Sequence, residues 1–330
     1  MKGLTPMDIE LIFNIVVYVF VFLFGVTIGS FLNVCIYRLP KGESLITNNS
    51  HCMSCGTPIK RYDLIPIISW IVLGGKCRAC GAKISPRYTV VEAMTALMFV
   101  LCYYFFPYDV NGIYFALLAL FISGLIVLAF QDLDTQEMCV SVLIYTAIVA
   151  VLTHVLSYIS TSTGALLTMP VTLKESIIGM LCVSVPLLII GFVITPVVYV
   201  LFISQDHKDK RRLKRAVKAA PNDHERAKLN AKLDKVKAKI KENGPVFGFG
   251  MGDIVVMAAG GLMLGWKAAV TAAVVAVITG AVYAIIKRAV SDDDESGSAF
   301  AFGPFLIIGL VIGAYFGADI IDAYIAYTFG

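Results

Sequence analysis

The sequence predicts an all-α polytopic membrane protein with about eight transmembrane helices, a small cytoplasmic zinc-binding domain and a cytoplasmic helical hairpin insertion. Three observations support this fold class. Hydrophobic residues make up 58% of the 330 residues, whereas soluble domains contain about 45–50%. Several uncharged windows reach the roughly 20 residues that cross a bilayer core. Two C-x-x-C pairs lie in a polar stretch, and a second, strongly basic stretch interrupts the apolar windows further on.

The apolar windows predict helices, because hydrocarbon offers backbone groups no hydrogen-bond partner. Residues 1–10 hold one basic residue, Lys2, and the first apolar run is longer than the core of a signal peptide, so we expect no cleavable signal. Small residues in the sixth window (Gly260, Gly261 and Gly265) predict close approach of neighbouring helices. The eight expected spans are 11–36, 89–106, 112–131, 139–159, 174–203, 251–266, 268–287 and 303–327.

The basic residues predict the orientation. Loops 38–88, 204–249 and 287–302 carry 24 of the 27 Lys and Arg residues. Basic loops stay in the cytoplasm, so we expect these loops there and both termini outside. The expected segments are 1–40, the first transmembrane helix; 41–88, the zinc-binding domain; 89–203, transmembrane helices 2–5 with the first aspartate motif; 204–247, the hairpin; and 248–330, the G-x-G-D motif with helices 6–8.

Four cysteines in the first basic loop predict a structural metal site. The stretches "CMSCGTPI" and "CRACGAKI" share the pattern C-x-x-C-G-x-x-I, and Gly56 and Gly81 allow a turn after the second thiolate. Four thiolates suit a closed tetrahedral zinc site. A reducing cytoplasm disfavours the alternative of two disulfides, and no thioredoxin-like pattern indicates a redox role. The expected zinc ligands are Cys52, Cys55, Cys77 and Cys80.

The stretch 204–247 predicts a basic helical hairpin outside the bilayer. Pro221 separates two helical segments, Asp223 is placed to cap the second one, and Asn243-Gly244 is placed to end it. Its positive charge predicts contact with anionic headgroups of membrane lipid, in preference to nucleic acid. Helical 4-3-4 spacing relates Leu229, Leu233, Val236 and Ile240.

Two acidic motifs lie at ends of spans that the predicted topology puts on one side of the membrane. Asp132 and Asp134 stand in "AFQDLDTQEM", and Asp253 stands in "GFGMGDI". Ionisable groups at membrane depth are costly and are candidates for a functional site. Two close carboxylates share a proton, so that one takes a proton from water while the other donates to a scissile carbonyl. For each aspartate alone, the alternatives are a helix cap and a solvated acid at the interface.

Asp132 and Asp253 form the expected catalytic pair. Asp134 lies two residues from Asp132, about 200° around a helix, so both cannot face one partner. The sequence holds no H-E-x-x-H or G-x-S-x-G motif of zinc or serine hydrolases. Close approach of an extended substrate backbone is expected at Gly248, Gly250 and Gly252.

Several motifs together resemble type IV prepilin peptidases. "GSFLNVCIYRLP", the paired knuckles, "SPRYTVVE", "DLDTQ" and "GFGMGD" occur in the order seen in that family. The resemblance implies an aspartic protease of the bacterial inner membrane that cuts the leader from prepilins or pseudopilins of type IV pili and type II secretion at the cytoplasmic face. It implies that Asp132 and Asp253 are catalytic and that the four cysteines hold zinc. Many members also N-methylate the new N-terminus with S-adenosylmethionine.

The chain departs from the family at two places. Met138-Cys139-Val140 stands where Leu-Pro-Asp is often found, and Val255 stands where Lys is often found. Both changes leave the carboxylates in place and alter candidate substrate contacts. The polar residues Asn33, Arg38 and Glu43 near the zinc domain are candidates for cofactor or substrate binding, and a packing role suits them equally. The alternative function is a polytopic membrane transporter with a zinc-stabilised cytoplasmic domain.

Overall fold

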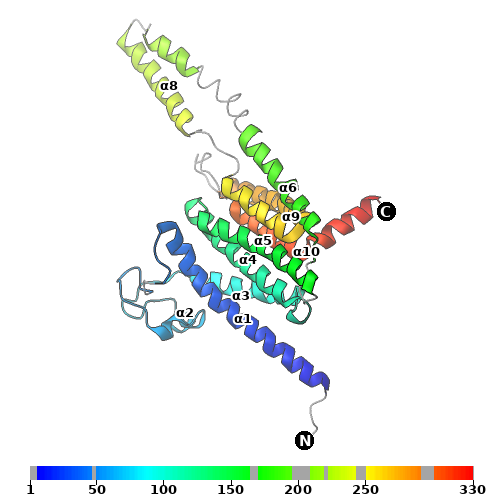
Figure 1. The fold of residues 1–330 in the computed structure, drawn as a ribbon. Coiled ribbons are helices and arrows are strands. Elements are labelled where there is room, and N and C mark those ends of the chain that lie inside the picture. The colour runs from blue at the N-terminus through cyan, green and yellow to red at the C-terminus, as the bar shows by residue number, and fades with distance from the viewer. Residues whose placement is uncertain are drawn as a thin grey trace.

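Seven long apolar helices make up the body of the computed structural model (Figure 1). The structure describes residues 6–46, 50–163, 170–194, 209–218, 222–242, 250–290 and 301–329. Within these ranges the regular elements are helical, apart from two isolated β-bridges. This confirms the prediction of an all-α, multi-pass membrane protein. The long helices are α1 (Pro6–Arg38), α3 (Arg87–Phe105), α4 (Tyr108–Thr135), α5 (Val140–Thr163), α6 (Leu173–Ile189), α9 (Met251–Val290) and α10 (Gly303–Phe329).

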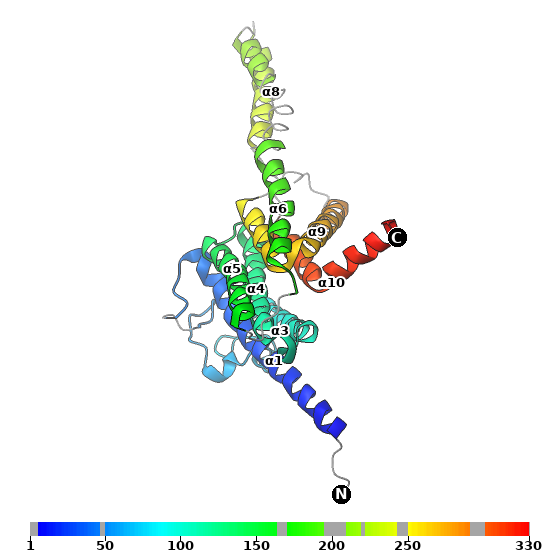
Figure 2. The same cartoon turned by 45° about the vertical axis from the view of Figure 1, so that its right-hand side comes forward.

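Helix α9 accounts for the difference between eight predicted spans and seven long helices in the described chain. It contains both the 251–266 and the 268–287 windows. Gly265 breaks it with the non-helical angles φ 82° and ψ 176°, a conformation that glycine adopts without a steric penalty. Figure 2 shows the two arms diverging from this bend as a V. Both predicted spans are therefore present, as the two arms of one bent helix.

Helix α4 is the centre of the bundle. Of its most apolar window, 72% is buried, the highest share among the seven helices. It packs against α1, α3, α5 and α10, while α9 packs against α6 and α10. A core of large side chains on α4, including Leu118, Phe121 and Leu125, is fully buried. The carboxyl end of α4, with its acidic motif, is thus held by packing on several sides.

Glycines allow close contact between α1 and α3. A Cβ atom added at Gly25 would lie 2.7 Å from the Cα of Ala96, and one added at Gly29 would lie 2.7 Å from the Cα of Glu92. These two glycines are four residues apart on α1, which is the small-x-x-x-small pattern of closely packed membrane helices. The first helix is therefore fixed to the helix that follows the cysteine-rich domain.

The glycine-rich start of α9 also packs closely, as its sequence predicted. Gly261 faces the backbone of Gly179 in α6, and Gly260 faces the side chain of Leu310 in α10. Neither position has room for a larger residue without movement of its neighbour. The first arm of α9 is consequently held between α6 and α10.

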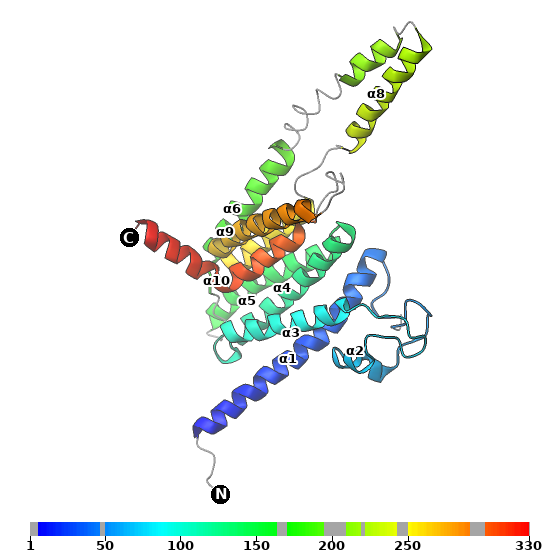
Figure 3. The same cartoon turned by 180° about the vertical axis from the view of Figure 1, so that it is seen from behind.

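The cysteine-rich domain lies beside the carboxyl-terminal half of α1 (Figure 3). It contains two short 3₁₀ turns, Leu39–Lys41 and Arg61–Leu64, and one short helix, α2 (Ile68–Val72). The backbone N–H of Ile67 donates a 2.7 Å hydrogen bond to Oε2 of Glu92 in α3. This bond connects the domain directly to the helical bundle.

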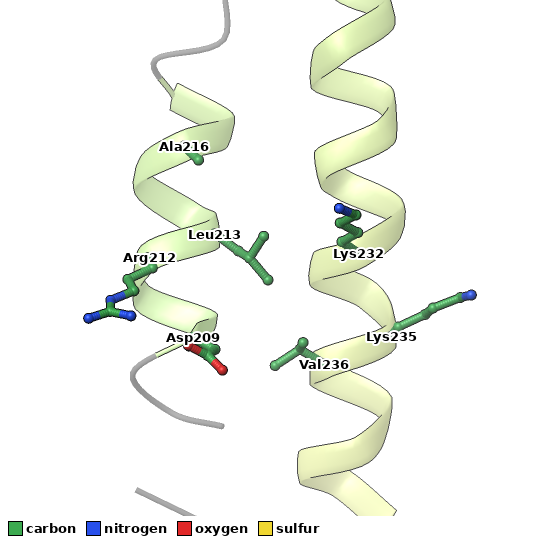
Figure 4. A pocket seen from close by; sticks show the side chains of 7 residues that line it. All are labelled: Asp209, Arg212, Leu213, Ala216, Lys232, Lys235 and Val236. Carbon is green, nitrogen blue, oxygen red and sulfur yellow. The ribbon is translucent and has the colours of Figure 1, made fainter. Parts of the chain in front are cut away.

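Two helical segments outside the bundle form the predicted basic hairpin. Residues 209–218 are helical, and α8 covers Asp223–Glu242. Figure 4 shows Leu213 and Val236 pointing toward each other between the two segments, and Leu233 is only 6% exposed. The predicted apolar residues Leu233 and Val236 therefore lie in the contact between the two helices of the hairpin. The expected features at Pro221 and Asn243-Gly244 and the side chains of Asp223 and Ile240 lie outside the described residues.

Candidate active site and metal site

Asp132 lies in the last turn of α4 and faces the start of α10. The residue is 7% exposed. Its Oδ2 atom accepts a 2.9 Å hydrogen bond from the backbone N–H of Gly303, the first residue of α10. A Cβ atom added at Gly303 would lie 2.7 Å from the same Oδ2, so only glycine leaves room for this contact. The carboxylate is therefore both buried and paired with the amino-terminal end of another helix.

Asp253 is also buried and lies at the start of α9. It is the third residue of that helix and is 8% exposed. Its Oδ2 accepts a 2.9 Å hydrogen bond from the N–H of Gly250. This is the contact of the third residue of a helix with the backbone N–H of the residue just before the helix, as in a capping box. Unlike a cap on a solvated helix end, however, this carboxylate is nearly inaccessible to water.

The two buried aspartates share one region of the protein. The side chain of Met138 lies against both Gly252, which precedes Asp253, and Gly303, which binds Asp132, although 121 positions separate the two aspartates in the sequence. Each carboxylate lies at the amino-terminal end of a helix, where the partial positive charge stabilises an anion. The N–H of Gly303 donates to Asp132, and the N–H of Gly250 donates to Asp253. Two close carboxylates in such surroundings favour a state in which they hold one proton between them.

Asp134 has a different environment. Its two carboxylate oxygens accept hydrogen bonds of 2.6 and 2.7 Å from the guanidinium of Arg87, the first residue of α3. The same guanidinium lies 5.0 Å from the ring centre of Phe130. The structure thus separates the two aspartates of "DLD", as their helical spacing predicted. Asp134 joins α4 to α3, and Asp132 faces α10.

Met138 covers the space between the two acidic motifs, a position that the sequence did not predict. A Cβ atom added at Gly252 would lie 2.9 Å from Sδ of Met138. The methyl end of the same side chain faces Gly303, beside the Asp132 carboxylate. Gly252 is therefore in contact with a side chain, and the open space expected for a substrate backbone is not found there. A Cβ atom added at Gly250 would lie 3.6 Å from Oδ2 of Asp253, an ordinary contact, and Gly248 lies outside the described residues.

Gln131 is a second residue that sequence reasoning missed. It is fully buried next to Asp132, and its Oε1 accepts a 3.2 Å hydrogen bond from the N–H of Cys139. Its Nε2 has no hydrogen-bond partner among the described residues. The amide holds the connection from α4 to α5 that carries Met138. A polar side chain at the end of an otherwise apolar window was the signal available for finding it.

The four predicted metal ligands come together in two similar turns. Their Sγ atoms all lie within 4.8 Å of one another, and those of Cys52 and Cys80 are 3.9 Å apart. The N–H of Gly56 donates to the carbonyl of Cys52, and the N–H of Gly81 donates to that of Cys77. Both glycines have φ near +70°, as predicted for a turn after the second thiolate.

These distances fit a tetrahedral zinc site. With Zn–S bonds of about 2.3 Å, the sulfurs of such a site are about 3.8 Å apart. The backbone N–H groups of Cys55 and Ser54 lower the pKa of the Cys52 thiol, and those of Cys80 and Ala79 lower the pKa of the Cys77 thiol. Lowered thiol pKa values favour the thiolate form that binds metal. At Cys80 the N–H of Ala82 lowers the pKa, but the neighbouring thiols of the cluster raise it to about 11. Cys52, Cys55, Cys77 and Cys80 could therefore hold one structural zinc ion.

Two of the three polar residues near the end of α1 form side-chain hydrogen bonds within the protein. Asn33 donates a 3.0 Å hydrogen bond to the carbonyl of Tyr88 in α3. Arg38 is 6% exposed and donates to the carbonyl of Ser44, and the N–H of Glu43 donates to the carbonyl of Arg38. These contacts fold the chain back at the end of α1. Val255, the other departure from the family pattern, packs against the apolar core.

The fold and these two sites define a multi-pass membrane protein with a four-cysteine domain and a buried pair of aspartates. The family model described as the bacterial peptidase A24 N-terminal domain matches residues 23–106. This range covers the carboxyl-terminal half of α1, the cysteine-rich domain and α3. This part of the chain is therefore similar to the N-terminal domain of bacterial peptidase A24, and the chain is similar to proteins named prepilin leader peptidase/N-methyltransferase.

Relatives match segments of the chain. The chain is 42% identical over 116 residues to the prepilin leader peptidase/N-methyltransferase of Myxococcus xanthus (strain DK1622). This match covers 35% of this chain and 34% of that protein. A type 4 prepilin-like proteins leader peptide-processing enzyme from Escherichia coli O78:H11 is 41% identical over 131 residues, 34% of this chain and 47% of that protein. The Klebsiella pneumoniae prepilin leader peptidase/N-methyltransferase is 39% identical over 123 residues, 36% of this chain and 53% of that protein. The matches thus span about a third to a half of these relatives, and no solved structure matches the chain.

The cysteine geometry predicts that one zinc ion copurifies with each chain. Cys52→Ser should lose the metal and loosen the domain cooperatively, because the binding energy of a structural metal is folding energy. Metal analysis of freshly purified, unchelated protein measures the stoichiometry, and limited proteolysis within residues 41–88 measures the loosening. Cys182→Ser, on α6 and remote in sequence from the four-cysteine domain, is the matched control and should keep its zinc. Protein purified without metal would contradict the assignment.

Proposed function

We propose that this chain is an intramembrane aspartic endopeptidase that removes the leader peptide of prepilins or pseudopilins. The observation that carries the proposal is the pair of buried carboxylates, Asp132 and Asp253. Each is held by an N–H group at the start of a helix, and the side chain of Met138 lies beside both. Such a pair supplies both an acid and a base at one place in a water-poor environment.

The two carboxylates perform hydrolysis by moving protons in opposite directions. The ionised member takes a proton from a water molecule, whose oxygen then bonds to the scissile carbonyl carbon. The protonated member donates its proton to the carbonyl oxygen, which gives a neutral tetrahedral diol. Breakdown of the diol breaks the C–N bond: the carboxyl group that took the proton from water gives it to the leaving nitrogen, while the other carboxylate takes a proton from one diol hydroxyl, whose oxygen becomes the carbonyl oxygen of the new carboxyl group. The role of acid or base belongs to the pair as a whole, since both share one proton before the reaction.

The position of the pair matches the proposed substrate. Asp132 is in the last turn of one membrane helix and Asp253 is in the first turn of another. A peptide bond reaches this depth when it lies where a basic leader meets an apolar helix, since the leader stays in water and the helix stays in lipid. The names of the relatives, which refer to prepilin leader processing, support this class of substrate. Met138 lies over the pair and would contact the residues next to the scissile bond.

Further elements of the proposal depend on the relatives and on the charge pattern. N-methylation of the new N-terminus, with S-adenosylmethionine supplying the methyl group, follows from the name of the relatives. The bacterial inner membrane is the proposed location, and the charge of the basic loops supports an orientation with the cysteine-rich domain, the hairpin and the aspartate pair toward the cytoplasm. The proposed division of the chain follows the five segments that the hydropathy predicts.

The first test replaces each aspartate separately. Asp132→Asn and Asp253→Asn should each reduce cleavage of a prepilin-like peptide by about 10³-fold or more, because an amide matches the carboxylate in shape but cannot exchange the proton. Zinc content and thermal stability in detergent should stay close to those of the parent protein. Mass spectrometry of the product N-terminus measures cleavage.

Asp134→Asn is the matched control for these variants. It weakens a partly exposed ion pair with Arg87, which costs about 1 kcal/mol or less, and should keep most of the activity. Near-normal cleavage by Asp253→Asn would exclude this residue from the chemistry. Methylation of a pre-cleaved pilin peptide by either inactive variant would show that the two proposed activities use separate groups.

The hairpin is expected to act outside the cleavage site. Replacement of residues 206–242 by a short flexible linker should leave peptide cleavage in detergent largely intact, because the two helices project away from the bundle (Figure 1). Binding to vesicles with anionic lipid should fall, and the difference from the parent protein should shrink as salt rises. Peptide cleavage and vesicle flotation measure the two effects. A folded deletion variant without detergent activity would show that the hairpin belongs to the site.

A further inference from the structure

The cysteine-rich domain exposes a strip of large apolar side chains around α2. The stretch 64–75, "LIPIISWIVLGG", contains no charged residue. Exposed fractions rise from 44% at Leu64 to 64% at Ile71 and 72% at Val72. We call the following residues the α2 apolar strip: Leu64, Ile65, Ile68, Ile71 and Val72. A domain that lay free in water would expose such a strip at a considerable cost.

The strip is a fixed surface, because the opposite side of α2 is anchored inside the domain. The hydroxyl of Ser69, which is 8% exposed, donates a 3.0 Å hydrogen bond to the carbonyl of Tyr62. Nε1 of Trp70 donates a 3.1 Å hydrogen bond to the carbonyl of Ile84, and the indole packs against Gly75. Ile68, Ile71 and Val72 are related by steps of three and four residues and therefore share the outward face.

The bond between Ile67 and Glu92 fixes the depth of the strip. Helix α3 has 19 residues, a length of about 28 Å, which is close to the thickness of a bilayer core of about 30 Å. Glu92 lies five residues after the start of α3, about 7 Å along its axis. The 2.7 Å hydrogen bond from Ile67 holds the start of α2 at the level of this carboxylate. An interfacial helix buries its apolar face about 5–10 Å into the boundary between headgroups and acyl chains. The depth of about 7 Å at Glu92 lies within this range.

The residues around the α2 apolar strip match the acyl-chain and headgroup layers of a membrane surface. On the bundle side, α1 and α3 expose apolar side chains at the same level, including Phe31 at 49% and Val90 at 53%. On the other side, the uncharged stretch is flanked by the exposed basic residues Lys60, Arg61 and Lys76. Apolar contacts toward the acyl chains and basic residues toward phosphate are the arrangement of a membrane-surface helix.

We propose that the α2 apolar strip is inserted in the lipid leaflet on the side of the cysteine-rich domain. The metal-binding domain is then a membrane-embedded region of the protein, with its cysteine turns above the lipid and α2 within the headgroup region. Glu92 and Ser30, whose hydroxyl also binds the Glu92 carboxylate, join this inserted element to α3 and α1. The inference stands on the surface and the depth alone and does not depend on the proposed peptidase activity.

The test places a benzophenone amino acid at one position of the full-length protein in vesicles of phosphatidylcholine and phosphatidylglycerol. One protein carries it in place of Ile71. The matched control carries it in place of Met53, which is 60% exposed in the first cysteine turn. After illumination, intact-protein mass spectrometry should show the mass gain of one phospholipid at position 71 and none above background at position 53. Zinc content and the thermal midpoint establish that both proteins are folded.

Four outcomes would overturn the proposal. Equal lipid labelling at both positions, or none at position 71, would place the strip outside the leaflet. A covalent dimer formed through position 71 would show that a second copy of the chain covers the strip. If position 71 labels an added prepilin-like peptide in place of lipid, the strip is a substrate surface. None of these readouts requires cleavage, so a failure here is distinct from a failure of the peptidase assignment.

Discussion

Two carboxylates at membrane depth each need a hydrogen-bond donor, and the arrangement of α4, α9 and α10 provides one for each. A charge buried without compensation costs several kcal/mol. Asp132 meets this requirement through the first N–H of α10, and Asp253 meets it through the N–H just before α9. Both donors belong to helix starts, where further N–H groups and the helix dipole favour an anion. The carboxylates can thus remain buried, close together and reactive.

Several features of the fold follow from this requirement. The first arm of α9 must begin beside the end of α4, and the bend at Gly265 returns the chain so that α10 can begin there as well. Glycine at position 303 leaves the room that the Asp132 carboxylate occupies. Gln131 holds the connection to α5, which places Met138 over the pair. The ion pair between Arg87 and Asp134 fixes the same end of α4 to α3.

Local patterns in the sequence predicted much of this structure, because hydropathy and motif spacing depend on residues that are close together in the sequence. Most apolar windows matched the long helices within a few residues, while the end of the 174–203 window lies outside the described residues; the repeated C-x-x-C-G pattern predicted both cysteine turns. The contact of Asp132 with Gly303 joins residues 171 positions apart, and no periodicity encodes which helix start meets which carboxylate. The position of Met138 and the sharp bend in α9 likewise depend on the packing of several helices. The separation of Asp132 from Asp134 could be predicted, since it needs only the rotation per residue of a helix.

Asp132 and Asp253 are proposed to work as one unit, and the double variant tests this most directly. The measurement is kcat/KM for cleavage of a prepilin-like peptide by Asp132→Asn, Asp253→Asn and the protein that carries both changes. Groups that act together lose their whole contribution when either one is removed. We therefore expect the double variant to be within about tenfold of each single variant. Losses that multiply, so that the double variant is slower by the product of the two single effects, would show two independent groups and contradict a shared proton.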